Sequence, residues 1–181
     1  MNHSECLTDN DNNMSKLLSE DAKKYIEHWK AKFTPEQKKG ALIASLMYLQ
    51  KENGGYLTTP IMEALADYLE ITNIEVLEVA TFYSMFDLKE VGKNKIYLCT
   101  NISCQLRGVD EIAKRFKDKL SVEFGETTED KKFTLKEFEC LGACTRAPMC
   151  LINETYHENL TVESVDKIID DLREESQDDH E

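Results

Sequence analysis

The sequence predicts an α+β protein in which a helical N-terminal half precedes a sheet covered by helices. In the first half, apolar residues recur at helical spacing between short polar links. The second half mixes short apolar runs with helical segments in the order β-α-β-β-α. With 181 residues, 41% of them hydrophobic, the chain is long enough for one domain with a helical extension.

The overall charge excludes some classes of partner. The formal net charge is -13 at pH 7. Affinity for nucleic acid comes mainly from Lys and Arg side chains that neutralise phosphates, so we expect no nucleic-acid partner. Acidity likewise disfavours anionic membrane surfaces. No apolar run approaches the roughly 20 residues that span a bilayer, so we expect no direct membrane insertion.

The N-terminal residues indicate the compartment in which the chain works. Residues 1–16 are polar and rich in Asn and Asp, which predicts a disordered arm. They show neither the apolar core of a signal peptide nor the Arg-rich character of a transit peptide. We therefore expect a cytosolic, reducing setting, in which structural disulfides are disfavoured.

Residues 17–90 are expected to form a helical bundle of four short helices. Gln37 and Glu75 each stand three residues after a threonine, which predicts two capping boxes. Gly54 and Gly55 end the second helix. The residues expected to begin the four helices are Ser19, Thr34, Thr59 and Thr72.

Residues 91–174 are expected to form the second domain. Apolar or alternating runs at 95–100 and 131–140 predict strands, and residues 108–120 have helical spacing. A hairpin is expected to turn near Asn153, and a closing helix to begin at the capping residue Thr161. Residues 175–181 form an acidic tail.

The most informative residues are two close pairs of cysteines. Cys99 and Cys104 are separated by four residues, and Cys140 and Cys144 by three. Each pair follows the C-terminal end of an expected strand, where a sheet commonly presents ligands on loops. If the two strands are neighbours, the two loops face one another with two thiolates each.

Several kinds of site could use these thiols: two disulfides, a zinc site, a redox dithiol or an iron–sulfur cluster, with coincidence as the alternative. Four-cysteine zinc sites usually have two-residue gaps, and a redox dithiol favours CxxC beside a helix N-terminus. The wider gaps here favour a [2Fe–2S] cluster, in which each iron takes two thiolates. Cys150, in an apolar run, is expected to be a buried hydrophobe, and Cys6 lies in the predicted arm.

Other residues near the cysteine pairs could adjust the charge of such a site. Gly108 and Gly142 permit main-chain N–H groups to turn towards sulfur, which would stabilise a thiolate-bound group. Arg107 and Arg146 could offset negative charge there, or could equally be solvated or contact a partner. The histidines show no paired ligand spacing, which disfavours a Rieske-type cluster.

The cysteine arrangement and four further stretches resemble the 24 kDa subunit family of respiratory complex I, the NADH:quinone oxidoreductase, which contains a thioredoxin-like [2Fe–2S] ferredoxin domain. The resemblance covers about residues 20–173. The stretches are "ALIASLMYLQKENGGYL", "EVATFYSMF", "CLGACTRAP" and "LTVESVDKII".

The resemblance implies a thioredoxin-like fold for residues 91–174 and names the ligands, cofactors and partner. The cluster ligands would be Cys99, Cys104, Cys140 and Cys144. The chain would exchange single electrons with the FMN of a flavin- and NADH-binding partner subunit, and no nucleotide-binding motif of its own is visible. We expect a hetero-oligomer in the peripheral arm of a complex at the cytoplasmic face of a bacterial inner membrane.

Two other functions remain open at this point. The same motifs occur in the equivalent subunit of NAD(P)-linked hydrogenases and formate dehydrogenases. An interaction module stabilised by zinc, without a redox role, is the alternative from another class. The aromatic residues Phe82, Tyr83 and Phe86 are expected to lie in the core or a subunit interface rather than on an electron pathway.

Overall fold

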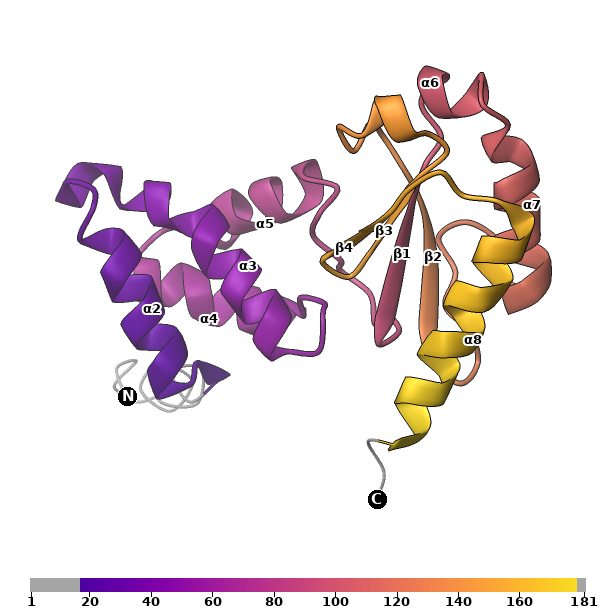
Figure 1. Cartoon of the computed structure of the whole chain (residues 1–181). Helices are drawn as coiled ribbons and strands as arrows, with labels where there is room; N and C mark the ends of the chain where they lie inside the picture. The colour runs from indigo at the N-terminus through magenta and orange to yellow at the C-terminus, as the bar shows by residue number, and fades with distance from the viewer. Residues whose placement is uncertain (1–16, 179–181) are drawn as a thin grey trace, which may run out of the picture. The chain divides into compact units, whose positions relative to one another are not determined.

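The structure is a computed structural model that describes residues 17–178. The predicted arm, with Cys6, and the last three residues of the predicted tail lie outside the described residues. The chain divides into two compact units, one ending at Glu90 and the other beginning at Val91. The α+β class predicted from the sequence is confirmed by the secondary structure of these two units (Figure 1).

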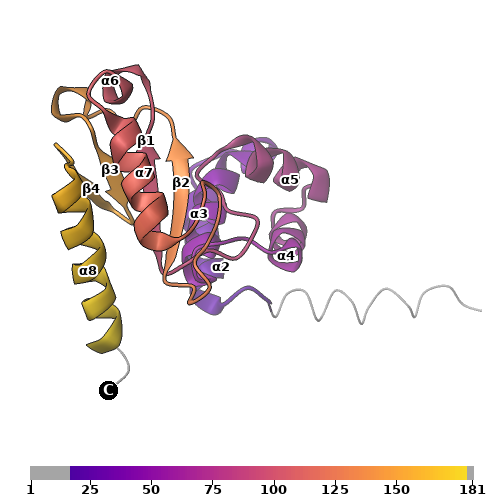
Figure 2. The ribbon, with the colours of Figure 1, turned by 90° about the vertical axis from the view of Figure 1, so that its right-hand side faces the viewer.

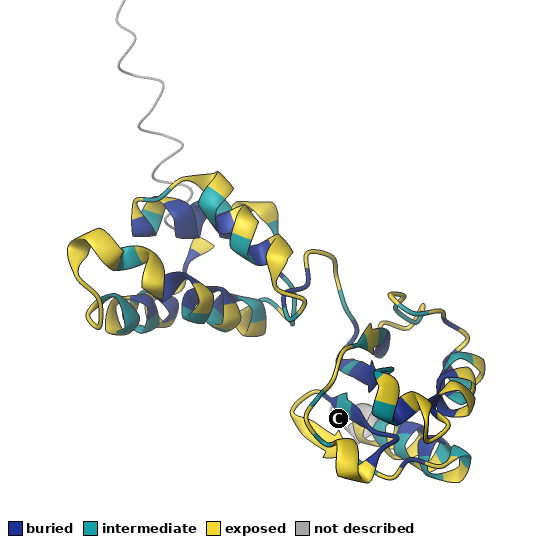
Figure 3. Ribbon diagram, turned by 90° about the horizontal axis from the view of Figure 1, so that it is seen from above, coloured by how far each residue is buried: buried dark blue, intermediate teal, exposed yellow. Residues whose placement is uncertain are grey.

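The first unit is helical and has its own apolar core. Leu46, Leu65 and Leu69 lie at the centre of this core and are fully buried. Figure 3 shows that buried and exposed residues alternate along the helices, as amphipathic helices require. The elements run in the order α2 (Glu20–Lys30), η2 (Pro35–Ala41), α3 (Leu42–Glu52), α4 (Thr59–Leu69) and α5 (Asn73–Phe82).

Two of the expected capping interactions are present and one is not. The Ser19 hydroxyl accepts a hydrogen bond from the main-chain N–H of Ala22 at 3.0 Å, and Thr72 and Glu75 form the predicted capping box. The box predicted at Thr34 is wrong, because Gln37 adopts φ -106° and ψ 17° and cannot continue an α-helix. The chain instead forms the 3-10 segment η2 before α3 begins.

The second unit is a four-stranded mixed sheet with helices. The sheet order is β2-β1-β3-β4, in which β1 and β2 are parallel and the other two pairings are antiparallel. The predicted hairpin is present, with Asn153 at a φ of 54° between β3 and β4. The elements are β1 (Asn94–Cys99), α6 (Ile102–Gln105), α7 (Val109–Leu120), β2 (Phe133–Phe138), η3 (Cys144–Arg146), β3 (Cys150–Ile152), β4 (Thr155–His157) and α8 (Val162–Asp178).

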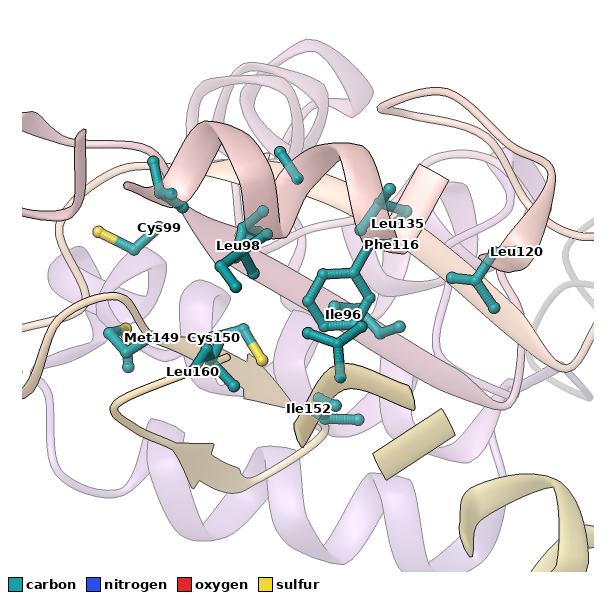
Figure 4. Close-up of a cluster of buried hydrophobic side chains, with 14 of the residues drawn as sticks. Ile96, Leu98, Cys99, Phe116, Leu120, Leu135, Met149, Cys150, Ile152 and Leu160 are labelled. Carbon is teal, nitrogen blue, oxygen red and sulfur yellow. The ribbon is translucent and has the colours of Figure 1, made fainter. Parts of the chain in front are cut away.

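Helices α7 and α8 cover one face of this sheet, as Figures 1 and 2 show. Phe116 of α7 and Ile169 of α8 are fully buried in the same apolar cluster as the strand residue Ile96. Figure 4 shows Phe116 beside Ile96. Arg115 and Asp166 join the two helices through two hydrogen bonds of 2.6 Å each. No helix within residues 17–178 has both the length and the apolar character needed to cross a bilayer.

A buried hydroxyl fixes the loop that enters β1. The Thr134 side chain is buried in β2, and its Oγ1 accepts a hydrogen bond from the main-chain N–H of Gly92 at 2.6 Å. We expect Thr134→Val to lower the free energy of unfolding by about 1–3 kcal/mol, because it leaves a buried N–H without an acceptor. Urea denaturation measures this loss, and Thr155→Val, on the exposed strand β4, is the control. Equal effects of the two variants would contradict the prediction.

Candidate metal centre

Both cysteine pairs leave the sheet at the same edge. Cys99 is the last residue of β1 and lies opposite Phe138, the last residue of β2, in the parallel register. Cys140 follows only two residues after Phe138. Since the carboxyl ends of parallel strands meet at one edge, the loops that follow β1 and β2 lie beside each other. The structure therefore meets the condition, stated from the sequence, that the two strands are neighbours.

The first pair of thiols is buried. The exposed fraction is 2% for Cys99 and 1% for Cys104. Asn101 begins the short helix α6, since its side-chain oxygen accepts a hydrogen bond from the main-chain N–H of Ile102 at 2.9 Å. This single turn brings Cys104 back towards the end of β1.

The main chain of Met149 holds both cysteines of this first pair. Its carbonyl oxygen accepts a hydrogen bond from the N–H of Cys99 at 3.2 Å, and its N–H donates to the Cys104 sulfur. Burial raises the pKa of the Cys104 thiol, and its hydrogen bond with Cys99 raises it further. Cys144 also raises this pKa through its charge, so the second pair lies within electrostatic reach of the first.

The second pair of thiols is exposed. The sulfur atoms of Cys140 and Cys144 lie 3.4 Å apart. Gly142, between them, has a φ of 83° in the left-handed region, which glycine adopts without a steric penalty. The main-chain N–H of Gly142 donates to the Cys140 sulfur and lowers the pKa of that thiol. The inward N–H expected at Gly142 is thus present.

Two hydrogen bonds join the two cysteine loops, and a third joins the second loop to β4. The Asn101 side chain donates to the Glu139 carboxylate at 2.7 Å, and Arg107 donates to the carbonyl oxygen of Thr145 at 3.2 Å. Beyond β3, the Tyr156 hydroxyl donates to the Leu141 carbonyl oxygen at 3.0 Å. Sequence reasoning missed these contacts. Asn101 could have been recognised as the cap of a helical turn, but nothing in the sequence names its partner.

The structure also corrects expectations about neighbouring residues. The N–H of Gly108 donates to the Gln105 carbonyl oxygen at 3.0 Å, so it does not turn towards a sulfur as expected. Arg107 lies against the second cysteine loop, whereas Arg146 forms an ion pair with Glu158 at 2.7 Å. The Arg107 side chain therefore connects the first cysteine loop to the second.

Cys150 is the first residue of β3 and belongs to neither cysteine loop. It is fully buried in the core of the sheet unit, where Figure 4 shows it among the labelled apolar residues. Burial raises the pKa of this thiol to about 12. Its burial within a strand fits the small buried hydrophobe expected from the sequence.

The loops present a set of soft donors with N–H groups directed at sulfur. The five described cysteines are free thiols. Within residues 17–178, no three Cys, His, Asp or Glu side chains converge closely enough to hold a single metal ion. The donors instead form one buried pair and one exposed pair, each with a main-chain N–H that stabilises a thiolate. Such a set fits an iron–sulfur cluster, in which each iron takes two thiolates.

Fold and site together define a mixed α/β domain that presents two thiol pairs at one edge of its sheet. Residues 23–173 match the family model described as thioredoxin-like [2Fe-2S] ferredoxin, and the chain belongs to this family. The family resemblance read from the sequence is thereby confirmed.

Similar proteins include one from a bacterium and one from a mitochondrion. An NADH-quinone oxidoreductase subunit of Rickettsia bellii is 49% identical over 142 residues, which is 78% of this chain and 85% of that protein. A mitochondrial NADH dehydrogenase [ubiquinone] flavoprotein 2 from Dictyostelium discoideum is 40% identical over 148 residues, covering 82% of this chain and 60% of that protein.

A solved structure shares the fold. One chain of an NAD+-reducing [NiFe]-hydrogenase in the air-oxidised state superposes with a TM-score of 0.65 at 19% identity. The match covers 74% of this chain but only 23% of the hydrogenase chain. Similarity at this level of identity is evidence for the fold alone.

Proposed function

We propose that the chain is an electron-transfer subunit of an NADH:quinone oxidoreductase. It holds one [2Fe–2S] cluster and exchanges single electrons with the FMN of a partner subunit that oxidises NADH. The observation that carries the proposal is the emergence of two thiol pairs from adjacent parallel strands at one sheet edge. The family match and the names of the similar proteins support it. The four ligands are Cys99, Cys104, Cys140 and Cys144.

The residues around the thiols adapt this site to a negatively charged group. A bound [2Fe–2S] cluster accepts and releases one electron at a time. The main-chain N–H groups of Met149 and Gly142 donate to the sulfurs of Cys104 and Cys140. Such donors stabilise the extra negative charge of a reduced cluster and so would raise its reduction potential. Burial of the first pair excludes water from one side of the site.

Iron and sulfide analysis after anaerobic purification tests the cluster. We expect about two irons and two acid-labile sulfides per chain, as a [2Fe–2S] cluster contains. Stoichiometric zinc without sulfide would contradict the proposal and favour the zinc-stabilised interaction module instead. The proteins that co-purify test the context: a proton-pumping membrane arm fits the proposal, whereas a hydrogenase or formate-oxidising subunit would replace it.

The helical unit offers a surface for the flavin- and NADH-binding partner. Ile74, Leu77 and Phe82 of α5 are exposed, and the exposed fraction of Phe82 reaches 79%. Phe86, by contrast, is buried in the core of this unit. Exposed apolar residues gathered on one helix are typical of a protein–protein interface. We therefore assign α5 to the interface, within the peripheral arm of the complex.

Charge placed on α5 should weaken this association. We expect Leu77→Glu combined with Phe82→Glu to weaken binding of the partner subunit by about tenfold or more, since buried aromatic and aliphatic anchors dominate interfaces. A pull-down of the flavin subunit measures the loss. Iron content serves as the internal control and should not change. Glu78→Gln, on the same helix, is the matched surface variant, and a loss as large with it would contradict the assignment.

A further inference from the structure

We propose that Cys140 and Cys144 form a reversible disulfide when the chain holds no cluster, so that a disulfide oxidant blocks cluster assembly. This makes the exposed pair a modification site as well as half of the ligand set. The inference rests on the proposed function, because it assigns a second reaction to two of the proposed ligands.

The geometry of the second pair favours this bond. The two sulfur atoms are 3.4 Å apart, and a disulfide needs about 2.05 Å, so they must approach by about 1.3 Å. Both side chains are exposed, with Cys140 on the loop after β2 and Cys144 at the start of the 3-10 segment η3, so neither lies in the sheet. Gly142, at a φ of 83°, gives the loop between them a backbone position without a Cβ, and a methyl group there would meet no atom within 4 Å. The movement that joins the sulfurs is thus short, and neither sulfur is held within a strand.

The other described cysteines do not share these properties. Cys99 and Cys104 are nearly inaccessible, and Cys150 is fully buried in the core. An oxidant in solution reacts with accessible thiolates, so burial protects these three residues. The chain thus contains a reactive pair and a protected pair within one site.

The reaction is a thiol–disulfide exchange with a small disulfide such as oxidised glutathione. One thiolate of the pair attacks a sulfur of glutathione disulfide, forming a mixed disulfide and releasing one glutathione thiolate. The second thiolate then attacks the protein sulfur of that mixed disulfide and releases the other glutathione. The protein loses two protons and two electrons, and one glutathione disulfide becomes two glutathione thiols.

The oxidised pair cannot serve as a ligand set. Metal binding requires thiolates, and the sulfurs of a disulfide carry no such charge. Cluster assembly would then have only the buried pair available. A dithiol reductant reverses the exchange and restores both ligands, so the redox state of the surrounding thiol pool would decide whether the chain can be loaded.

The experiment uses the full chain isolated without cluster. One sample is treated with oxidised glutathione and one is kept reduced, and free thiols are then alkylated in an aliquot of each. Mass spectrometry of the peptide that contains Cys140 and Cys144 should show the loss of two hydrogens only after oxidation. The rest of each sample, oxidised or reduced, receives iron and sulfide without a dithiol. We expect the oxidised sample to show roughly tenfold less cluster absorbance than the reduced sample, since disulfides are poor ligands. Addition of dithiothreitol should restore the absorbance.

Three variants separate the possible outcomes. Cys140→Ser should abolish the disulfide, whereas Cys104→Ser and Cys150→Ser should still form it. A disulfide between other cysteines, no disulfide at all, or full cluster assembly in the oxidised chain would overturn the inference. Failure of the reduced chain to assemble a cluster would instead overturn the proposed function, and mass spectrometry would still report on the disulfide.

Discussion

Cys140→Ser is expected to abolish or grossly alter the cluster absorbance of the purified chain, while Cys150→Ser leaves that absorbance unchanged. Cys140 lies at the sheet edge with its sulfur 3.4 Å from that of Cys144 and accepts a hydrogen bond from Gly142. Iron–sulfur clusters are held by soft cysteine thiolates, and serine supplies a hard oxygen donor instead. Cys150 is buried in the core of the sheet unit and is not among the four proposed ligands.

Visible absorbance and iron and sulfide content, measured on anaerobically purified variants, check this prediction. A buried serine leaves a hydroxyl without an assured partner, which costs about 1–3 kcal/mol, so Cys150→Ala is included as a second variant of the core position. Loss of the cluster from both Cys150 variants at unchanged stability would show that the ligand assignment is wrong. Loss from Cys140→Ser alone would support the four ligands.

The strands that precede the cysteine pairs were within reach of the sequence. Apolar or alternating runs ended at Cys99 and Cys140, which predicted a strand before each pair. The sequence left open whether these strands are neighbours, and the parallel register of β1 and β2 answers that question. Capping was predictable where the side chain acts on its own helix, as at Ser19 and Thr72. The strands and the caps each depend on residues within a few positions of one another, and such short-range patterns can be read from a single sequence.

The remaining features depend on contacts between distant residues. Asn101 bonds Glu139 across 38 positions, and no local pattern selects that carboxylate from the many in this acidic chain. The contrast between the buried and the exposed thiol pair also arises from packing, since Met149 approaches Cys99 and Cys104 only in the folded sheet. At Thr34 the local pattern predicted a capping box that does not form, because the backbone at Gln37 is not helical.

Phe116→Ala is expected to lower the free energy of unfolding of the sheet unit by about 3–5 kcal/mol, the range for deleting a buried aromatic ring. Phe116 is fully buried between α7 and the sheet, among residues that extend to Cys99 and Cys104. Since domains are stable by only about 5–15 kcal/mol, this loss should release the cluster at a much lower urea concentration. Cluster absorbance followed during denaturation measures the shift.

The matched control lies in the core of the helical unit. Leu65 is fully buried there, and Leu65→Ala should cost about 2–5 kcal/mol in that unit. Because the two apolar cores share no residues, the midpoint of cluster loss should stay unchanged in Leu65→Ala, while the helical signal is lost earlier. If Leu65→Ala released the cluster as early as Phe116→Ala does, the two units would have to unfold together. The stability of the metal centre would then depend on both cores rather than on the sheet unit alone.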